Sequence, residues 1–273
     1  LGIASVKAHR LITRANQEGA IKLTIDGDIA ECVALENRLS ELYGLSYCEV
    51  TPDLSEPGLP LRALGIAGAA YLRRAIEAGE YDIIGVGHGR TLAALVEQMP
   101  RVDAGQVRFV SLLGGLTRNY AANPHDVMHR LAGKTGASAF VMPVPFFANT
   151  VTDREVLLAQ RGVHEVFELA AKSSLKLIGI GTAKPEASLV SSGMIEHAEI
   201  ADVKAKGGVG EMLGHFFDRE GRVIETALTA RTLSIDLDAS PDTKFVAVAG
   251  GDEKTGAIRS VLMSGRLNGL ITD

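Results

Sequence analysis

The amino-acid sequence predicts an α/β fold built on a mostly parallel β-sheet with helices on both faces. The first observation is the order of elements: beyond residue 60, short apolar runs typical of buried strands alternate with longer stretches of helical periodicity. The second is composition, because 46% of the residues are hydrophobic and 30 are glycine, whereas 5% are aromatic and tryptophan is absent. Buried parallel strands joined by glycine-rich turns have this composition. The length of 273 residues suits one large domain with a small appendage.

The first 26 residues precede this pattern and resemble the second half of a helix-turn-helix. Residues 1–5 resemble its tight turn, and Ser5 is placed to cap a helix that runs to about residue 18. Residues 20–25 alternate like the short strand of a wing, so the chain is expected to begin in the middle of the motif. The polar face of the helix carries Lys7, Arg10, Arg14 and Gln17 at spacings of three and four residues. We predict that Ser5, Lys7, Arg10 and Arg14 contact DNA, although a solvated basic helix face has the same pattern.

The charge distribution agrees with DNA contact at this end of the chain. Residues 1–25 hold four Lys or Arg against the single acid Glu18, a balance of +3, while the whole chain carries −5. The remaining residues therefore sum to −8, and a basic end on an acidic body is expected when only one end contacts phosphate. The excess is small, so an assembly of several copies is expected to be needed for firm binding.

A linker region is predicted between this segment and the rest of the chain. Residues 28–43 have the apolar spacing of a second helix, and residues 45–50 form a short strand candidate. Residues 51–60 contain three prolines and are the best candidate for a boundary. We therefore divide the chain into a DNA-binding segment with its linker helix at 1–50 and a larger domain at 51–273.

The larger domain is predicted to contain strands and helices in alternation, without internal repeats. Helices are expected at 61–78, 91–99, 124–135, 153–159, 163–173 and 253–263. Strands are expected at 81–86, 107–112, 138–142, 175–180, 223–230, 245–249 and 267–272.

Ligands of such sheets bind at the carboxyl ends of the strands, and four glycine-rich turns follow predicted strands. The first, Gly-His-Gly-Arg-Thr at 87–91, precedes a helix, so backbone amides, the helix N-terminus, Arg90 and the Thr91 hydroxyl could surround an anion. A tight turn alone would also require the glycines. The other turns lie at 114–119, 179–182 and 249–254. Lys254 falls in the first turn of its predicted helix, where a cation is unfavourable unless an anion or solvent is near.

Five motifs in order resemble the sugar-binding effector domain of SorC-family transcriptional regulators. They are the run at 82–91, Leu-Leu-Gly-Gly-Leu at 112–116, Gly-Gly-Val-Gly-Glu at 207–211 with Phe-Phe-Asp at 216–218, Val-Ala-Gly-Gly at 248–251 with Lys254, and Gly-Leu-Ile-Thr-Asp at 269–273. The similarity covers residues 55–273, and the N-terminal segment fits the helix-turn-helix of the family. The branch that regulates the catabolism of erythritol and other polyols is the most similar.

The resemblance implies a Rossmann-like fold related to ribose-5-phosphate isomerase and glucosamine-6-phosphate deaminase, used for sensing. It implies that the turn Gly87, His88, Gly89, Arg90 and Thr91 holds a sugar phosphate, that Glu211 accepts sugar hydroxyls, and that Lys254 contacts phosphate or hydroxyl oxygens. Gly114, Gly115, Gly250 and Gly251 belong to the matching turns, and Asn123 and Asp126 are candidates for the pocket wall. His88 and Arg90 depart from residues common in the family at these positions, so an unphosphorylated polyol remains an alternative ligand.

The function implied is regulation of a carbohydrate or polyol catabolic operon. A sugar, sugar phosphate or polyol effector would alter the binding of a homodimer or homotetramer to operator DNA. The alternative is a sugar-phosphate isomerase or deaminase of the related fold, which needs an acid and a base among Asp82, Asp126, Glu211, His125 and His129. No catalytic residue and no cofactor are predicted.

Other sites and locations are disfavoured by the sequence. His125 and His129 have the spacing of a zinc pair but no obvious third ligand, so no metal is predicted. Cys32 and Cys48 indicate neither a metal site nor a disulfide framework. Without a signal peptide or a run of about 20 apolar residues, a cytoplasmic protein with no membrane contact is expected.

Overall fold

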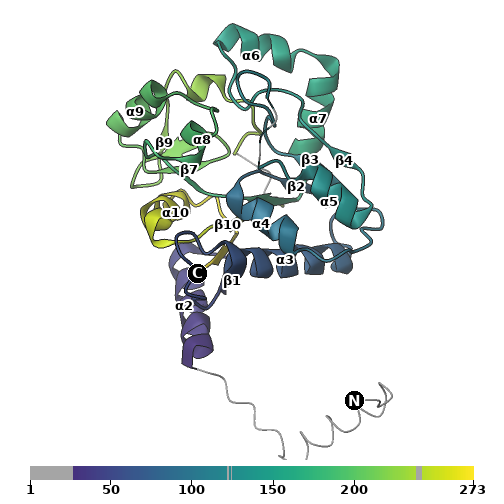
Figure 1. Ribbon diagram of the computed structural model, residues 1–273, viewed down its shortest axis with the longest axis vertical. Helices are drawn as coiled ribbons and strands as arrows, with labels where there is room; N and C mark the ends of the chain where they lie inside the picture. The colour runs from purple at the N-terminus through teal and green to yellow at the C-terminus, as the bar shows by residue number, and fades with distance from the viewer. Residues whose placement is uncertain (1–26, 122, 124, 238–241) are drawn as a thin grey trace, which may run out of the picture.

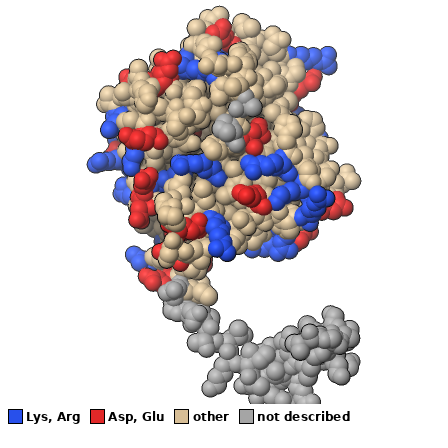
Figure 2. All heavy atoms as spheres, in the orientation of Figure 1, with Lys and Arg blue, Asp and Glu red and all other residues tan. Residues whose placement is uncertain are grey.

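The computed structural model describes residues 27–121, 123, 125–237 and 242–273 (Figure 1). The predicted helix at 5–18, the wing strand and the DNA-contacting residues Ser5, Lys7, Arg10 and Arg14 lie outside the described residues. Over the face drawn in Figure 2, Lys and Arg side chains are interspersed with Asp and Glu side chains.

The core of the fold is a seven-stranded sheet in which every neighbouring pair of strands is parallel, as predicted. In spatial order the strands are β1 (Tyr47–Val50), β11 (Gly269–Thr272), β10 (Lys244–Val248), β5 (Leu175–Ile178), β2 (Ile83–Val86), β3 (Arg108–Ser111) and β4 (Ala139–Phe140). Both faces of the sheet are buried. Phe109 packs into one apolar cluster and its neighbour Val110 into the other, because successive side chains of a strand point to opposite faces.

Helices lie on both faces of this sheet. The cluster that contains Phe109, here the first cluster, includes residues of α3 (Leu61–Ala78), α4 (Arg90–Gln98) and α5 (Met128–Thr135). The cluster that contains Val110, the second cluster, includes residues of α7 (Arg161–Ala171) and α10 (Thr255–Met263). Two glycines of α3 allow it to pack closely on α4, since a Cβ at Gly68 would lie 2.7 Å from Leu95 Cδ1 and one at Gly65 would lie 2.9 Å from the Ala94 carbonyl oxygen. The helix α6 (Val151–Leu158) contains no buried residue.

A second sheet, which the sequence analysis did not anticipate, covers one side of the molecule. It is a small antiparallel sheet in the order β6 (Gly181–Thr182), β7 (Gly210–Met212), β8 (His215–Phe217) and β9 (Val223–Ile224). The helices α8 (Ser188–Ser191) and α9 (His197–Ala205) connect β6 to β7. With its helices, this small sheet packs against the second face of the main sheet.

Three sequence predictions require correction. The strand predicted at 223–230 ends at Ile224 and is followed by the 3₁₀ turn η1 (Thr229–Arg231), because Thr226 and Thr229 exchange side-chain and backbone hydrogen bonds. The helix predicted at 124–135 begins at Met128, whose amide donates to the Asp126 carboxylate. The helix predicted at 253–263 is divided into the 3₁₀ turn η2 (Asp252–Lys254) and α10. The other predicted elements beyond residue 60 are confirmed, with ends that shift by a few residues.

The predicted linker helix is α2 (Gly27–Tyr43), which projects from the rest of the described chain (Figure 1). Its Leu39 and Tyr43 pack against the core, whereas Ile29, Val33 and Leu42 are exposed. The strand that follows, β1, pairs with β11 at the edge of the main sheet. The division of the chain at residue 50 stays a prediction. Among the described residues, no helix combines the length and apolar character needed to cross a membrane.

Candidate functional site

The candidate site lies where the strand order of the main sheet reverses. From β2 the chain continues outward through β3 and β4, whereas β5 is followed by β10 and β11 on the other side. The crevice between the carboxyl ends of β2 and β5 is the position at which open α/β sheets bind ligands. A cavity of about 330 Å³ opens there, and the turns that follow both strands line it.

The cavity has one wall from the main sheet and one from the small sheet. The main-sheet wall includes Gly87, His88, Gly89, Arg90, Thr91, Leu113, Asn123, His125 and Phe146. The opposite wall includes Thr182, Lys184, Glu186, Leu189, Ser192, Met194, Glu211 and Leu213. The turn η2, which follows β10 of the main sheet, adds Glu253 and Lys254. Eight predicted ligand-binding residues therefore line one cavity, namely the five of the 87–91 turn, Asn123, Glu211 and Lys254.

The turn at 87–91 joins β2 to the N-terminus of α4. Gly87 donates its amide to the Leu177 carbonyl of β5 at 2.8 Å, which fixes the turn to the neighbouring strand. Gly89 precedes α4 with a φ of 126°, a conformation that L side chains rarely adopt, and no side chain caps the helix. The exposed Arg90 and the buried Thr91 follow. An uncapped helix N-terminus beside a cation and a hydroxyl forms an anion-binding arrangement.

His88 contributes a neutral polar group to the same wall. Its ring lies edge-on to Phe146, with centroids 5.1 Å apart and planes at 87°. Burial, reinforced by the nearby His125, lowers the pKa of His88 to about 3. At neutral pH the imidazole is therefore uncharged and offers one hydrogen-bond donor and one acceptor, as suits a ligand hydroxyl.

Two further ionisable groups of the cavity are Glu211 on β7 and Lys254 on η2. Glu211 is 8% exposed on β7 and accepts the Gly214 amide at 2.6 Å. Burial raises the pKa of Glu211 to about 7, against the effects of the Gly214 amide and Lys254. The Lys254 ammonium donates to the Ile180 carbonyl at 2.7 Å, and burial together with Arg90 lowers its pKa to about 8 despite Glu211. Both groups are thus held away from bulk water. In such a shielded site, polar contacts to a ligand are stronger than in water.

The remaining predicted residues support the walls without lining the cavity. Gly114 packs against the Pro145 backbone, and Gly115 lies beside Asp126, whose carboxylate accepts the Met128 amide. In the last turn, the Gly251 amide donates to the Asp273 carboxylate at 2.8 Å, and a side chain at Gly250 would meet the same carboxylate. These glycines allow close approach of backbone segments behind the site.

Several lining residues carry no local sequence signal of a ligand site. The turn at 179–182 is glycine-rich but has no predicted ligand contact, and the segment at 186–194 contains no motif. Phe146, Leu189 and Met194 are apolar lining residues that only their position in the fold reveals. Across the described part of the chain, no group of three or more His, Cys, Asp or Glu side chains could hold a metal ion.

Comparison with known proteins identifies the family. Residues 27–273 match the family model described as "Putative sugar-binding domain". The chain is 63% identical over 273 residues to the erythritol catabolism regulatory protein EryD of Brucella abortus, covering 100% of this chain and 86% of that protein. It is 30% identical over 278 residues to the transcriptional regulator LsrR of Klebsiella pneumoniae, covering 100% of this chain and 83% of that protein.

Solved structures agree with this assignment. The full-length sorbitol operon regulator SorC of Klebsiella pneumoniae superimposes with a TM-score of 0.77 at 25% identity, over 99% of this chain and 88% of that chain. A DeoR-family regulator of Listeria monocytogenes shares the fold with a TM-score of 0.78 at 21% identity, over 89% and 97% of the two chains. These relatives are transcriptional regulators and not enzymes, so the isomerase or deaminase alternative is not favoured. The chain belongs to the SorC family of sugar-binding transcriptional regulators.

Proposed function

We propose that this regulator controls a carbohydrate or polyol catabolic operon. Its effector, a sugar, sugar phosphate or polyol, binds in the cavity at the carboxyl ends of β2 and β5. The observation that carries the proposal is the combination of groups in that cavity. The uncapped start of α4, Arg90 and Lys254 provide positive charge, and the buried Glu211 provides a hydrogen-bonding carboxyl group on the opposite wall. Such a pairing suits a molecule with hydroxyl groups and an anionic or strongly polar end.

The proposed roles follow from these positions. The turn of Gly87, His88, Gly89, Arg90 and Thr91 binds the polar end through backbone amides, the helix N-terminus and the Thr91 hydroxyl. Glu211 binds hydroxyl groups of the effector, and Lys254 contacts its phosphate or hydroxyl oxygens. The similarity to the erythritol catabolism regulator makes a four-carbon polyol or its phosphate the first effector to test.

The proposed output is altered binding to operator DNA. Ser5, Lys7, Arg10 and Arg14 contact the DNA, a homodimer or homotetramer presents paired helices to the two half-sites, and the protein acts in the cytoplasm. The helix α2 joins the two regions, and its exposed Ile29 and Val33 are available to a second copy. Replacing both by Glu is expected to reduce assembly in sedimentation measurements while effector binding persists. Unchanged assembly would exclude this face of α2.

A thermal-shift panel tests the effector assignment. It contains pentoses, hexoses and four-carbon polyols, each with and without phosphate. A compound at a hundred times its Kd stabilises the folded chain by about 2.7 kcal/mol. A large shift by one compound that is recovered chemically unchanged supports a sensor. Conversion of the compound would instead make the protein an enzyme, and the absence of any shift would contradict the assigned ligand classes.

A further inference from the structure

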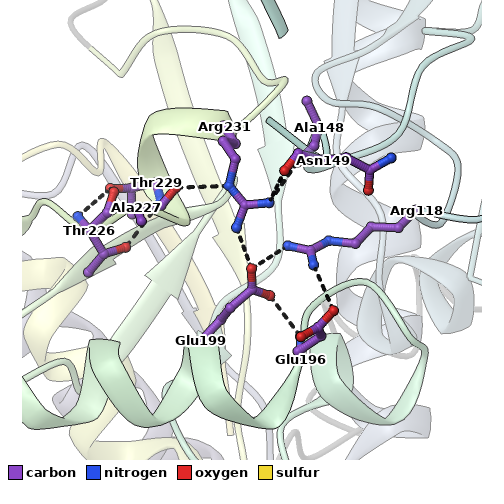
Figure 3. A network of polar contacts seen from close by, with 9 residues as sticks. All are labelled: Arg118, Ala148, Asn149, Glu196, Glu199, Thr226, Ala227, Thr229 and Arg231. Atoms are coloured by element: carbon purple, nitrogen blue, oxygen red, sulfur yellow. Dashed lines mark hydrogen bonds and ion pairs between the residues drawn. The ribbon is translucent and has the colours of Figure 1, made fainter. Parts of the chain in front are cut away.

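A cluster of charged side chains outside the cavity joins three segments that border it (Figure 3). Glu199 of α9 accepts from Arg118 at 2.5 Å and also pairs with Arg231 of η1. Its second carboxylate oxygen accepts the Glu196 amide at 2.8 Å. The three charged side chains are 12–17% exposed, so the pairs are shielded from water. Burial raises the pKa of Glu199, but the Glu196 amide and both guanidinium groups outweigh it and keep the pKa below its ordinary value.

Arg231 extends the cluster to the segment after Phe146. Its guanidinium donates to the carbonyl oxygens of Ala148 and Asn149, each at 2.9 Å, and to that of Ala227 at 2.9 Å. Its own carbonyl accepts the Ala148 amide at 2.9 Å. Figure 3 shows both guanidinium groups pointing toward the Glu199 carboxylate.

Three of the segments that the cluster joins carry a cavity-lining residue nearby, whereas η1 does not. Asn123 follows Arg118 in the sequence, Met194 precedes Glu196 at the start of α9, and Phe146 precedes Ala148. Arg118, Glu199 and Arg231 do not line the cavity themselves. The cluster therefore lies outside the cavity lining and connects segments that carry residues of the main-sheet wall to the start of α9, which carries Met194 of the other wall.

We propose that Glu199 is a positioning residue of the effector site, which holds the small-sheet wall at the distance from the main-sheet wall that the effector requires. The proposal rests on the proposed function in that it takes the cavity as the effector site. The physical reason is that one carboxylate satisfies two guanidinium groups and a helix-start amide. Removing its charge takes away the carboxylate that Arg231 pairs with and leaves Arg118 only its longer pair with the exposed Glu196 at 3.4 Å. The segment at 116–121 and the start of α9 then lose their common anchor.

The test compares Glu199→Gln with a matched control. Glutamine keeps the size of the side chain and removes its charge. The control is Glu165→Gln, which alters an Arg–Glu pair on α7 that is exposed and remote from the cavity lining. In the absence of effector, hydrogen exchange of amides 117–121 and 187–195 is expected to rise about tenfold in Glu199→Gln. Exchange in β10 and in the control is expected to match the original chain.

Affinity provides the second measurement, because a merely structural role would leave it unchanged at temperatures where the chain is fully folded. Erythritol and its terminal phosphate ester serve as probes, and the one that stabilises the original chain is expected to bind Glu199→Gln about tenfold more weakly. Unchanged exchange in the two segments, a uniform rise throughout the chain, or unchanged probe affinity would overturn the proposal. Arg118→Lys, which keeps the charge but not the forked geometry, gives a second variant if Glu199→Gln does not fold.

The two proposals fail in different ways. If neither probe nor any other sugar or polyol shifts the original chain, the effector assignment fails, while the exchange measurement still decides whether Glu199 fixes the walls of the cavity. If a compound binds the original chain and Glu199→Gln equally well, the effector assignment stands and the positioning role is excluded.

Discussion

The two walls of the cavity are constructed in different ways. The main-sheet wall is formed by turns that directly follow buried parallel strands, and the Gly87 amide is bonded to the neighbouring strand β5. The small-sheet wall is formed by strands of two or three residues and by the short helix α8. Ladder hydrogen bonds are few in such a sheet, so side-chain contacts have to determine its position. This contrast explains why a charged cluster outside the cavity lining joins segments of the two walls.

The first prediction asks whether the two walls unfold together and carries the largest expected effect. Phe109 of β3 and Phe217 of β8 are both 0% exposed. Replacing either by Ala is expected to lower the free energy of unfolding by about 3–5 kcal/mol, because a large cavity is left in a close-packed core. Urea denaturation is expected to show one transition for each variant. A separate early transition in Phe217→Ala alone would show that the small sheet unfolds independently.

The second prediction concerns Glu211, the buried acid of the small-sheet wall. Its pKa is raised from 4.5 to about 7, so between these pH values the folded chain retains a proton that the unfolded chain releases. Glu211 therefore lowers stability progressively as pH rises through this range. Glu211→Gln is expected to raise the free energy of unfolding by up to about 3 kcal/mol above pH 7 and to change it little below pH 4.5. Urea denaturation of both chains across this pH range measures the difference in the free energy of unfolding. A difference that does not depend on pH would contradict the prediction.

The sequence predicted the main-sheet wall better than the small-sheet wall, for a physical reason. Buried parallel strands are continuous apolar runs that end in glycine-rich turns, so β2, β5 and the turn at 87–91 are visible locally. Strands of two or three residues are too short to show a period, and β6, β7 and β8 were missed. Glu211 was found only through the family resemblance.

The charged cluster could not be predicted from local pattern at all. Glu199 and its two arginines are separated by long stretches of chain, and their pairing depends on how the small sheet packs. The error at 223–230 has a related origin, since a strand is predicted there from sequence and the threonine hydroxyls instead stabilise a turn.

The third prediction tests whether the turns after β2 and β10 of the main sheet both contact the effector. Thr91→Ala, after β2, and Lys254→Met, after β10, are each expected to weaken binding of the compound by about 1–3 kcal/mol, the range for hydrogen bonds to charged groups. Isothermal titration with the compound selected by the panel measures the change. Lys206→Met, at an exposed ion pair outside the cavity lining, is the control and is expected to bind normally. Weaker binding in only one variant would assign the ligand to one of the two turns.

The fourth prediction, with the smallest expected effect, contrasts two helix N-termini. The start of α4 faces the cavity and has no side-chain cap, whereas Thr150 caps α6 by accepting the Asp153 amide at 3.0 Å. Thr150→Ala is expected to lower the free energy of unfolding by about 1 kcal/mol, and Thr150→Ser to leave it nearly unchanged, because serine retains the hydroxyl. Urea denaturation of both variants measures this difference.

Saturating the protein with effector is expected to affect hydrogen exchange at the N-termini of α4 and α6 differently. If α4 receives its missing partner from the bound compound, hydrogen exchange in its first turn is expected to slow on binding, because the ligand then occupies amides that no side chain satisfies. The first turn of α6 already has its cap and is expected to exchange at the same rate with and without the compound. Equal protection of both helices would indicate general tightening of the chain, and the uncapped start of α4 would then have no special part in binding.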